Sequence, residues 1–306
     1  MTGPLPVTLP PLRGEVLSSW ISRHADFYGV TPLTMLRHGL PDATSLEAID
    51  FSLTNAQANR IAGMFGVSPQ LVRSLSFAGA PKAAHRFIAK SPMQRCGRCT
   101  QTDVSPPPIL RSELQGWRIT CSHCGEPYQD KTTSDGERTL EPYRAAARRG
   151  ETLLNNHAER RVETWLPPLE IARLLLMRRI PWPPPRDGDL WRYRLLGAIV
   201  PDFDAILARE TSFPHSPKHP ILPLCIRPAL LAGVAIIDRA GPPMLKMLHG
   251  HMMGENRKRF VMATDHLVSP AIEWGPPQQF QLISNPGQMI LSLKCQKSSN
   301  RPHSHI

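Results

Sequence analysis

Two pairs of cysteines constrain this chain more than any other feature of its sequence. Cys96 and Cys99 form the first pair, and Cys121 and Cys124 form the second. Zinc prefers four thiolates at the corners of a tetrahedron, and each Cys-x-x-Cys turn presents two of them. Residues 100–120 separate the pairs, slightly more than the roughly 15–20 residues usual for such a site. The spacing predicts one structural zinc ion bound by all four cysteines.

Other interpretations of these cysteines remain open. They could form two disulfide bonds or be unrelated thiols, although the doubled spacing favours a metal site. A catalytic zinc is disfavoured because four thiolates leave no coordination position for water. His123 is either a substitute ligand or a surface residue of the second turn, and the surface position is favoured. Gly97 and Gly125 would supply the backbone freedom that such turns use.

The cysteine pattern and the lengths of the apolar runs indicate the cellular compartment of the protein. Zinc thiolates persist in reducing compartments, and Cys225 and Cys295 have no paired spacing. Residues 1–11 are rich in proline and lack the charged and apolar regions of a secretory signal. The longest apolar run, at 229–237, is too short to cross a bilayer. We therefore expect a cytoplasmic protein with no membrane partner.

Length and charge indicate the organisation of the chain. Its 306 residues leave room for two or three small domains, and 36 Lys+Arg against 25 Asp+Glu give a formal net charge of +11. This charge fits a phosphate-backbone partner, or simply a basic solvated surface. The 33 prolines predict short, interrupted helices. We expect a mainly α-helical fold with an N-terminal domain (1–90), a zinc-ribbon-like module (91–130), a helical C-terminal domain (140–275), and short β-like segments with a disordered tail (276–306).

Residues 54–76 have the pattern of a helix-turn-helix. Thr54 and Gln57 match a capping box, and Gly66 stands where a left-handed residue ends a helix. Ser68 then caps a second helix that has Pro69 at its first position. Two helices joined by a glycine turn are typical of a helix-turn-helix, although a plain helical hairpin without DNA contact gives the same pattern.

On the second helix of this pair, Gln70, Arg73 and Ser74 are expected to face outward. Side chains at these positions of a recognition helix contact base edges or phosphates, so they are candidate DNA-binding residues. A second candidate is the basic cluster Arg257, Lys258 and Arg259, which follows an expected helix at 242–253. This cluster would either contact phosphate or complement the helix C-terminus.

The sequence of the rest of the chain predicts further helices but few candidate metal-binding or DNA-binding residues. His249 and His251 are two residues apart, which places them on different helix faces, so surface positions are favoured over metal ligation. Within the cysteine module, residues 114–120 could form a ribbon strand. Trp117 would then pack on the metal turns, since core packing is the more frequent role for a lone tryptophan, or alternatively stack on a base. Further helices are expected at 15–28, 31–39, 143–179, 189–199, 202–210 and 228–239, and β-like runs at 280–283 and 289–293.

The motif search favours a protein without catalytic activity. No GxxxxGK[ST], HExxH or GxSxG pattern occurs in the sequence. Acidic residues such as Glu15, Asp26, Asp202 and Asp204 are scattered, although spacing alone leaves a DDE-type two-metal site as an alternative.

The order of the motifs resembles that of the TniQ family of transposition proteins. The chain begins with a proline-rich segment containing Leu-Pro-Pro at 9–11, followed by Gly-Glu-Val-Leu-Ser-Ser-Trp-Ile-Ser-Arg at 14–23. The first cysteine pair, Gly-Trp-Arg at 116–118 and Cys121 follow in the same order. The resemblance covers roughly the first 130 residues. It departs at Cys124, where many relatives have histidine, and either residue binds zinc.

This resemblance implies a non-enzymatic adaptor. Such proteins link a DNA site, or a DNA-bound targeting complex, to an AAA+ ATPase regulator and through it to a transposase. In some relatives the targeting complex is RNA-guided and the adaptor is a head-to-tail homodimer. The alternative is a zinc-containing helix-turn-helix transcription regulator, which would use the same basic surface. A regulator usually needs a two-fold dimer, and no dimer helix is evident in the sequence.

Overall fold

Helices make up almost all of the regular structure. The computed structural model describes residues 4–99, 107–128, 140–160, 165–176, 194–201, 203, 221–250, 252, 254–265 and 274. Over these residues no strand forms, and the β pairing consists of isolated bridges. The predicted mainly α-helical fold is therefore confirmed. None of the described helices is long and apolar enough to cross a membrane.

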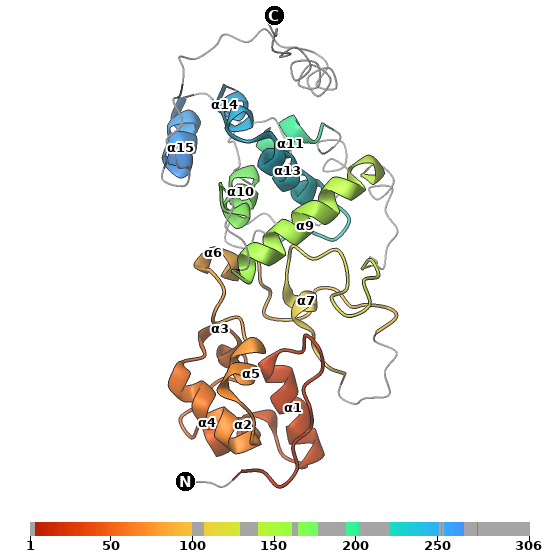
Figure 1. The fold of residues 1–306 in the computed structure, drawn as a ribbon, viewed down its shortest axis with the longest axis vertical. Coiled ribbons are helices and arrows are strands. Elements are labelled where there is room, and N and C mark those ends of the chain that lie inside the picture. Colours follow the sequence, from red (N-terminus) through yellow and green to blue (C-terminus); the bar gives the residue numbers. More distant parts are fainter. Residues whose placement is uncertain are drawn as a thin grey trace, which may run out of the picture.

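The N-terminal part is a bundle of short helices, drawn at the bottom of Figure 1. Its core contains Trp20, Ile21, Leu36, Ile61 and Phe65, each at most 2% exposed. Apolar residues at helical spacing place these side chains on the inner faces of their helices. The helices of the bundle are α1 (Leu17–Phe27), α2 (Pro32–Gly39), α3 (Ala48–Ser52), α4 (Asn55–Phe65) and α5 (Pro69–Ser74).

The predicted caps of α4 and α5 are present. The Thr54 hydroxyl accepts from the Gln57 backbone N–H at 3.2 Å, and the Gln57 side chain accepts from the Thr54 N–H at 2.9 Å. Gly66 ends α4 with φ of 66°, which glycine adopts without strain. The Ser68 hydroxyl accepts from the Leu71 N–H at 3.2 Å. These local signals confirm the predicted pair of helices joined by a glycine turn.

The motif at 14–23, which includes the first two turns of α1, holds the preceding proline-rich segment against this helix. Glu15 is buried and accepts two hydrogen bonds from Arg23, at 2.8 and 2.9 Å, and one from the Ser19 hydroxyl at 2.9 Å. The Trp20 indole donates to the carbonyl of Leu9 at 2.8 Å. Glu15, Trp20 and Arg23 of the motif thus all have hydrogen-bond partners within this part of the fold, which indicates a structural role for the motif.

The segment after the bundle forms two short helices, α6 (Lys82–His85) and α7 (Arg111–Leu114). The expected strand at 114–120 is wrong. Leu114 is the last residue of α7, and residues 115–120 make only isolated β-bridges. The side chain of Glu113 accepts from the Leu110 N–H at 3.1 Å, and the Gln115 N–H donates to the first carbonyl of α7. These local hydrogen bonds use backbone groups that a ribbon strand would need.

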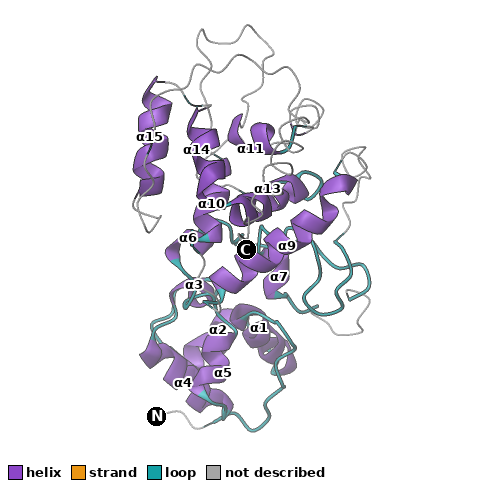
Figure 2. Ribbon diagram, turned by 45° about the horizontal axis from the view of Figure 1, so that its top comes forward, coloured by secondary structure: helices purple, strands orange, loops and turns teal. Residues whose placement is uncertain are grey.

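The C-terminal half packs around α13, as Figures 1 and 2 show. Its helices are η1 (Glu141–Tyr143), α9 (Arg144–Ala158), α10 (Pro168–Leu175), α11 (Arg194–Ile199), α13 (Arg227–Ala240), α14 (Pro242–Gly250) and α15 (Gly254–Asp265). The helical stretch expected at 143–179 is thus divided. A Cβ on Gly150 would lie 2.0 Å from the Leu231 carbonyl oxygen, so α9 and α13 touch through a glycine. The expected helix at 202–210 lies almost wholly outside the described residues, and the β-like runs at 280–283 and 289–293 lie wholly outside them.

One large apolar core joins the middle of the chain to the C-terminal half. It contains Phe77, Phe87, Trp117, Phe203 and Phe260. Trp117 is fully buried in this core, which makes a base-stacking role wrong. The expected core packing of Trp117 is confirmed, although it packs in the large core and the buried aromatic residue of the cysteine cluster is Tyr128. The domain boundaries near residues 90, 130 and 275 stay predictions.

Candidate metal centre and nucleic-acid interface

The fold brings the four predicted zinc ligands together. The sulfur atoms of Cys96, Cys99, Cys121 and Cys124 all lie within 4.8 Å of one another, and this cluster could hold a metal ion. The Sγ atoms of Cys96 and Cys124 are 3.4 Å apart, and those of Cys99 and Cys121 are 3.8 Å apart. Four sulfurs bound to zinc at about 2.3 Å in a tetrahedron lie roughly 3.8 Å apart. The donor set therefore fits zinc in both chemistry and size.

The sulfur distances also decide against the disulfide alternative. A disulfide holds two sulfurs at about 2.05 Å, far closer than any of the sulfur pairs with a measured separation here. Cys225 is buried in the large apolar core and is not part of the four-sulfur cluster. Among the cysteines that the structure describes, the four with Cys-x-x-Cys spacing thus form the cluster, and Cys225, which lacks this spacing, lies outside it.

The second cysteine turn has the local geometry of a metal-binding knuckle. The backbone N–H of His123 donates to the Cys121 sulfur at 3.4 Å, and the Gly125 N–H donates to the Cys121 carbonyl at 2.9 Å. Gly125 has φ of 77°, as expected, whereas Gly97 does not use a positive φ. The His123 side chain is exposed and lies outside the four-sulfur cluster, which agrees with a surface position.

Burial and crowding make this cluster unfavourable as four anions. Burial raises the pKa of the Cys96 thiol and, with added contributions from the neighbouring sulfurs, that of Cys99. By contrast, a hydrogen bond from the backbone of Glu126 lowers the pKa of Cys124 to about 7. Adjacent thiolates repel one another, and a bound cation would offset this repulsion.

A tyrosine and two serines support the cysteine cluster. Tyr128 is buried beside Cys96 and Cys121, and its hydroxyl donates to the Ser112 hydroxyl of α7 at 2.7 Å. The Ser122 hydroxyl, from the second turn, donates to the same Ser112 oxygen at 2.9 Å. Burial raises the pKa of the Tyr128 phenol, so it stays a neutral donor. These contacts fix the second cysteine turn on α7.

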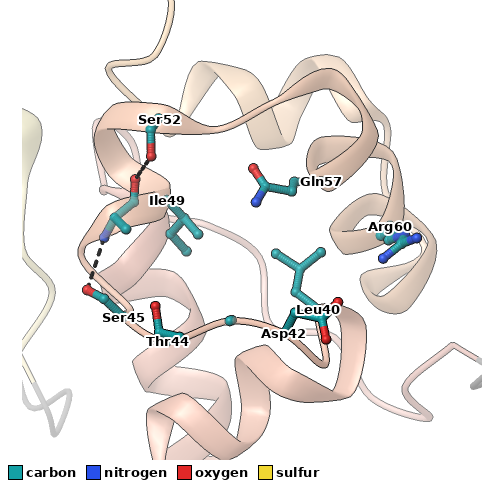
Figure 3. Close-up of a pocket in the computed structure, with 10 residues that line it drawn as sticks. Leu40, Asp42, Thr44, Ser45, Ile49, Ser52, Gln57 and Arg60 are labelled. Carbon is teal, nitrogen blue, oxygen red and sulfur yellow. Dashed lines mark hydrogen bonds between the residues drawn. The ribbon is translucent and has the colours of Figure 1, made fainter.

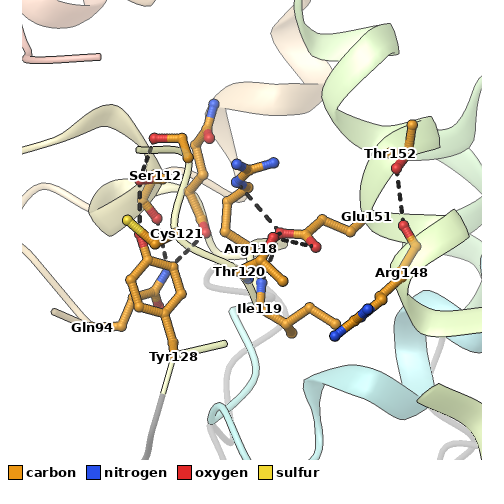
Figure 4. Close-up of polar contacts among 12 residues, drawn as sticks. Gln94, Ser112, Arg118, Ile119, Thr120, Cys121, Tyr128, Arg148, Glu151 and Thr152 are labelled. Atoms are coloured by element: carbon orange, nitrogen blue, oxygen red, sulfur yellow. Dashed lines mark hydrogen bonds and ion pairs between the residues drawn. The ribbon is translucent and has the colours of Figure 1, made fainter. Parts of the chain in front are cut away.

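A glutamate of α9 clamps the segment that leads into the second cysteine pair. Glu151 is 4% exposed and accepts from the backbone N–H groups of Ile119 and Thr120, each at 3.0 Å (Figure 4). The Thr120 hydroxyl also donates to this carboxylate, and Arg118 Nε lies 3.4 Å from it. The sequence reasoning missed this role. Its signal is a charged residue at a core position of a helix, between the buried Ala147 and Leu154.

An arginine of α13 makes a second connection to the cysteine module. Arg227 is 1% exposed and donates to the side chain of Gln94 at 2.8 Å and to the carbonyl of Arg118. Gln94 in turn donates to the carbonyl of Ser112 at 2.8 Å. Glu151 and Arg227 therefore tie two C-terminal helices to the segments that carry both cysteine pairs.

The candidate DNA-binding residues of α5 are on the surface. Gln70, Arg73 and Ser74 are exposed, as predicted. The helix has six residues and spans about 9 Å, which is short for a recognition helix. The Arg111 guanidinium of α7 donates to the Ser74 carbonyl at 3.0 Å, so it satisfies a carbonyl at the end of α5. DNA contact by these side chains stays a prediction.

The second basic cluster has a different setting from the one expected. Arg257, Lys258 and Arg259 lie in the first half of α15, so the proposed match to a helix C-terminus is wrong. Lys258 and Arg259 are exposed, whereas Arg257 donates to His249 Nε2 at 2.8 Å. His249 is 5% exposed, so its expected surface position is wrong, and burial lowers its pKa. His251 lies outside the described residues.

A pocket of about 200 Å³ is lined by the loop that follows α2, by helix α3 and by helix α4 (Figure 3). Leu40 and Ile49 provide its apolar part, and Asp42, Gln57 and Arg60 bring polar groups to it. Sites for small molecules usually enclose roughly 300–1,000 Å³. The pocket is therefore smaller than a typical small-molecule site.

The comparisons with known proteins agree with the order of the motifs. The TniQ family model matches residues 6–124, from the segment before α1 to the fourth cysteine of the cluster. No curated protein and no solved structure matches the chain. The C-terminal helices lie outside the matched range. The match confirms the resemblance noted in the sequence: residues 6–124 of this chain are similar to the TniQ family.

Proposed function

We propose that the protein is a non-enzymatic adaptor in DNA transposition. It links the recognition of a target site to an AAA+ ATPase regulator and, through that regulator, to a transposase. The observation that carries this proposal is the TniQ match over residues 6–124, a range that ends on the four-cysteine cluster. The same match favours the adaptor over a helix-turn-helix transcription regulator.

The proposed cofactor is one structural zinc ion bound by Cys96, Cys99, Cys121 and Cys124. The fit of the sulfur separations to a tetrahedral site supports it. Four thiolates fill the coordination sphere of zinc, so the ion would hold the two turns together and would not activate water. The motif at 14–23 is also proposed to have a structural role, which the buried ion pair of Glu15 with Arg23 supports.

The proposed adaptor contacts DNA and protein through different parts of the chain. Exposed residues of α5, above all Arg73, would contact the target DNA, and the exposed Lys258 and Arg259 of α15 would add phosphate contacts. The helical half after residue 140 would be the platform for the ATPase or for a targeting complex. Some relatives act as homodimers with an RNA-guided complex, so a second copy of this chain is also a proposed partner.

A reconstituted insertion reaction tests the adaptor role. An adaptor determines where insertion occurs and takes no part in strand chemistry. Omitting the protein should therefore abolish or scatter targeted insertion while the transposase still cleaves transposon ends. A matched control reaction contains the variant Lys82→Gln, which removes one exposed charge outside the proposed contacts. The proposal is wrong if targeting is equally good without the protein, or if the protein alone cleaves or joins DNA with Mg²⁺ or Mn²⁺.

A further inference from the structure

The exposed face of α9 concentrates positive charge. Arg144 and Arg149 have side chains 63% and 57% exposed, and Arg148 between them is also exposed. The one acidic residue of α9, Glu151, is turned inward to bind the segment before Cys121. The outward face of this helix therefore carries arginines without an acidic neighbour on the same helix.

These arginines stand where they do not help the helix. All three lie in the first two turns of α9, and its first turn has no acidic residue. Only Arg144 lies in the first turn, where the helix dipole disfavours a cation by about 0.3–1 kcal/mol. Arg144 pairs at 3.0 Å with Glu141, which is also exposed, so this ion pair contributes little, and Arg149 pairs at 3.4 Å with Asp238, whose side chain is 12% exposed. The stability of α9 therefore does not account for Arg144, and the exposed Arg148 has no acidic neighbour on the same helix.

We propose that Arg144, Arg148 and Arg149 form a binding surface for the phosphate backbone of duplex DNA. From the first to the last of these residues the helix rises about 7.5 Å, roughly two phosphate steps of 3.4 Å along one strand. The helix contains no Phe, Tyr or Trp. Single strands are usually held by aromatic side chains that stack on bases, so this face suits contact with phosphates alone and has no sequence preference.

The exposed arginines of α9 lie on the same helix that contacts the cysteine module. Arg148 lies one turn before Glu151, whose carboxylate binds the N–H groups of Ile119 and Thr120 (Figure 4). The arginine face is therefore fixed beside the chain that enters the second cysteine pair. This DNA surface is separate from α5, lies outside the family match, and does not depend on the adaptor role.

The test compares the whole protein with the triple variant Arg144→Gln, Arg148→Gln, Arg149→Gln on a random-sequence duplex. Two to three lost phosphate contacts lower the slope of log K against log salt by about 1.8–2.7. Between about 50 and 200 mM salt, the loss of affinity should thus be about 10- to 40-fold smaller for the variant than for the wild type. The triple change to lysine keeps the charges and should retain most of the affinity and slope.

A second triple variant controls for net charge. Arg37→Gln, Arg60→Gln and Lys246→Gln remove three exposed positive charges from α2, α4 and α14. This control should leave the salt slope within about one unit of the wild type. The proposal is overturned if the control and the α9 variant lose equal affinity, if the α9 variant binds like the wild type, or if single-stranded DNA or RNA competes better than duplex. Because this assay uses the protein and DNA alone, a failure of targeted insertion leaves its result unaffected.

Discussion

Replacing Glu151 tests whether α9 holds the cysteine module in place. In Glu151→Ala, the N–H groups of Ile119 and Thr120 and the Thr120 hydroxyl lose their acceptor, and Arg118 loses its ion-pair partner. Arg118 Nε has no hydrogen-bond partner among the described residues, so the nearby carboxylate is its main compensation. Removing one member of a buried charge pair costs about 3–5 kcal/mol. We expect the free energy of unfolding to fall by about that amount.

Two further variants separate this effect from the loss of any surface charge. Glu151→Gln keeps one acceptor oxygen and should cost less, about 1–3 kcal/mol. Glu141→Ala removes an exposed glutamate, with a side chain 55% exposed, and should change stability by less than about 1 kcal/mol. Urea unfolding measures these differences, and amide hydrogen exchange at Thr120 should accelerate in the alanine variant. If Glu151→Ala unfolds like Glu141→Ala, the clamp contributes nothing to stability and the reasoning fails.

Three further predictions follow from particular contacts. Gly150→Ala should lower the free energy of unfolding by at least about 1–3 kcal/mol in thermal unfolding, because its Cβ would meet the Leu231 carbonyl. As a control, Gly63→Ala on the open side of α4 should be neutral or stabilising. Burial raises the pKa of Asp50 from 3.8 to about 6, so the folded state binds the proton more tightly than the unfolded state. As pH rises from 4 to 6, the free energy of unfolding should therefore fall by at most about 3 kcal/mol. Asp50→Asn should remove this pH dependence in urea unfolding, and an unchanged profile would contradict it. Arg73→Glu should weaken duplex binding in a salt-dependent way without changing thermal stability, and unchanged binding would exclude DNA contact by α5.

Local signals account for what the sequence predicted well. The caps at Thr54 and Ser68 and the turn at Gly66 depend on residues three or four positions apart, so they are visible in the sequence. The cysteine cluster was predictable for a similar reason, since each Cys-x-x-Cys turn is local and one metal ion bound by both pairs would bring the two turns together.

Long-range contacts account for what the sequence did not predict. Arg227 meets Gln94 across 133 positions, and nothing in the spacing of either residue indicates its partner. His249 is buried because α15 folds back over it and brings Phe260 and Arg257 against its ring. The expected strand at 114–120 failed because Glu113 caps a helical turn there, an interaction that outweighs the apolar pattern.

The metal content of the purified protein tests the central claim most directly. Elemental analysis of the full chain, prepared under reducing conditions, should give one zinc per chain. Cys96→Ser or Cys121→Ser should lose the metal and unfold the module around it, because metal binding supplies folding free energy there. Cys225→Ser, outside the four-sulfur cluster, should keep the zinc. A folded, reduced wild-type protein without zinc would contradict the account.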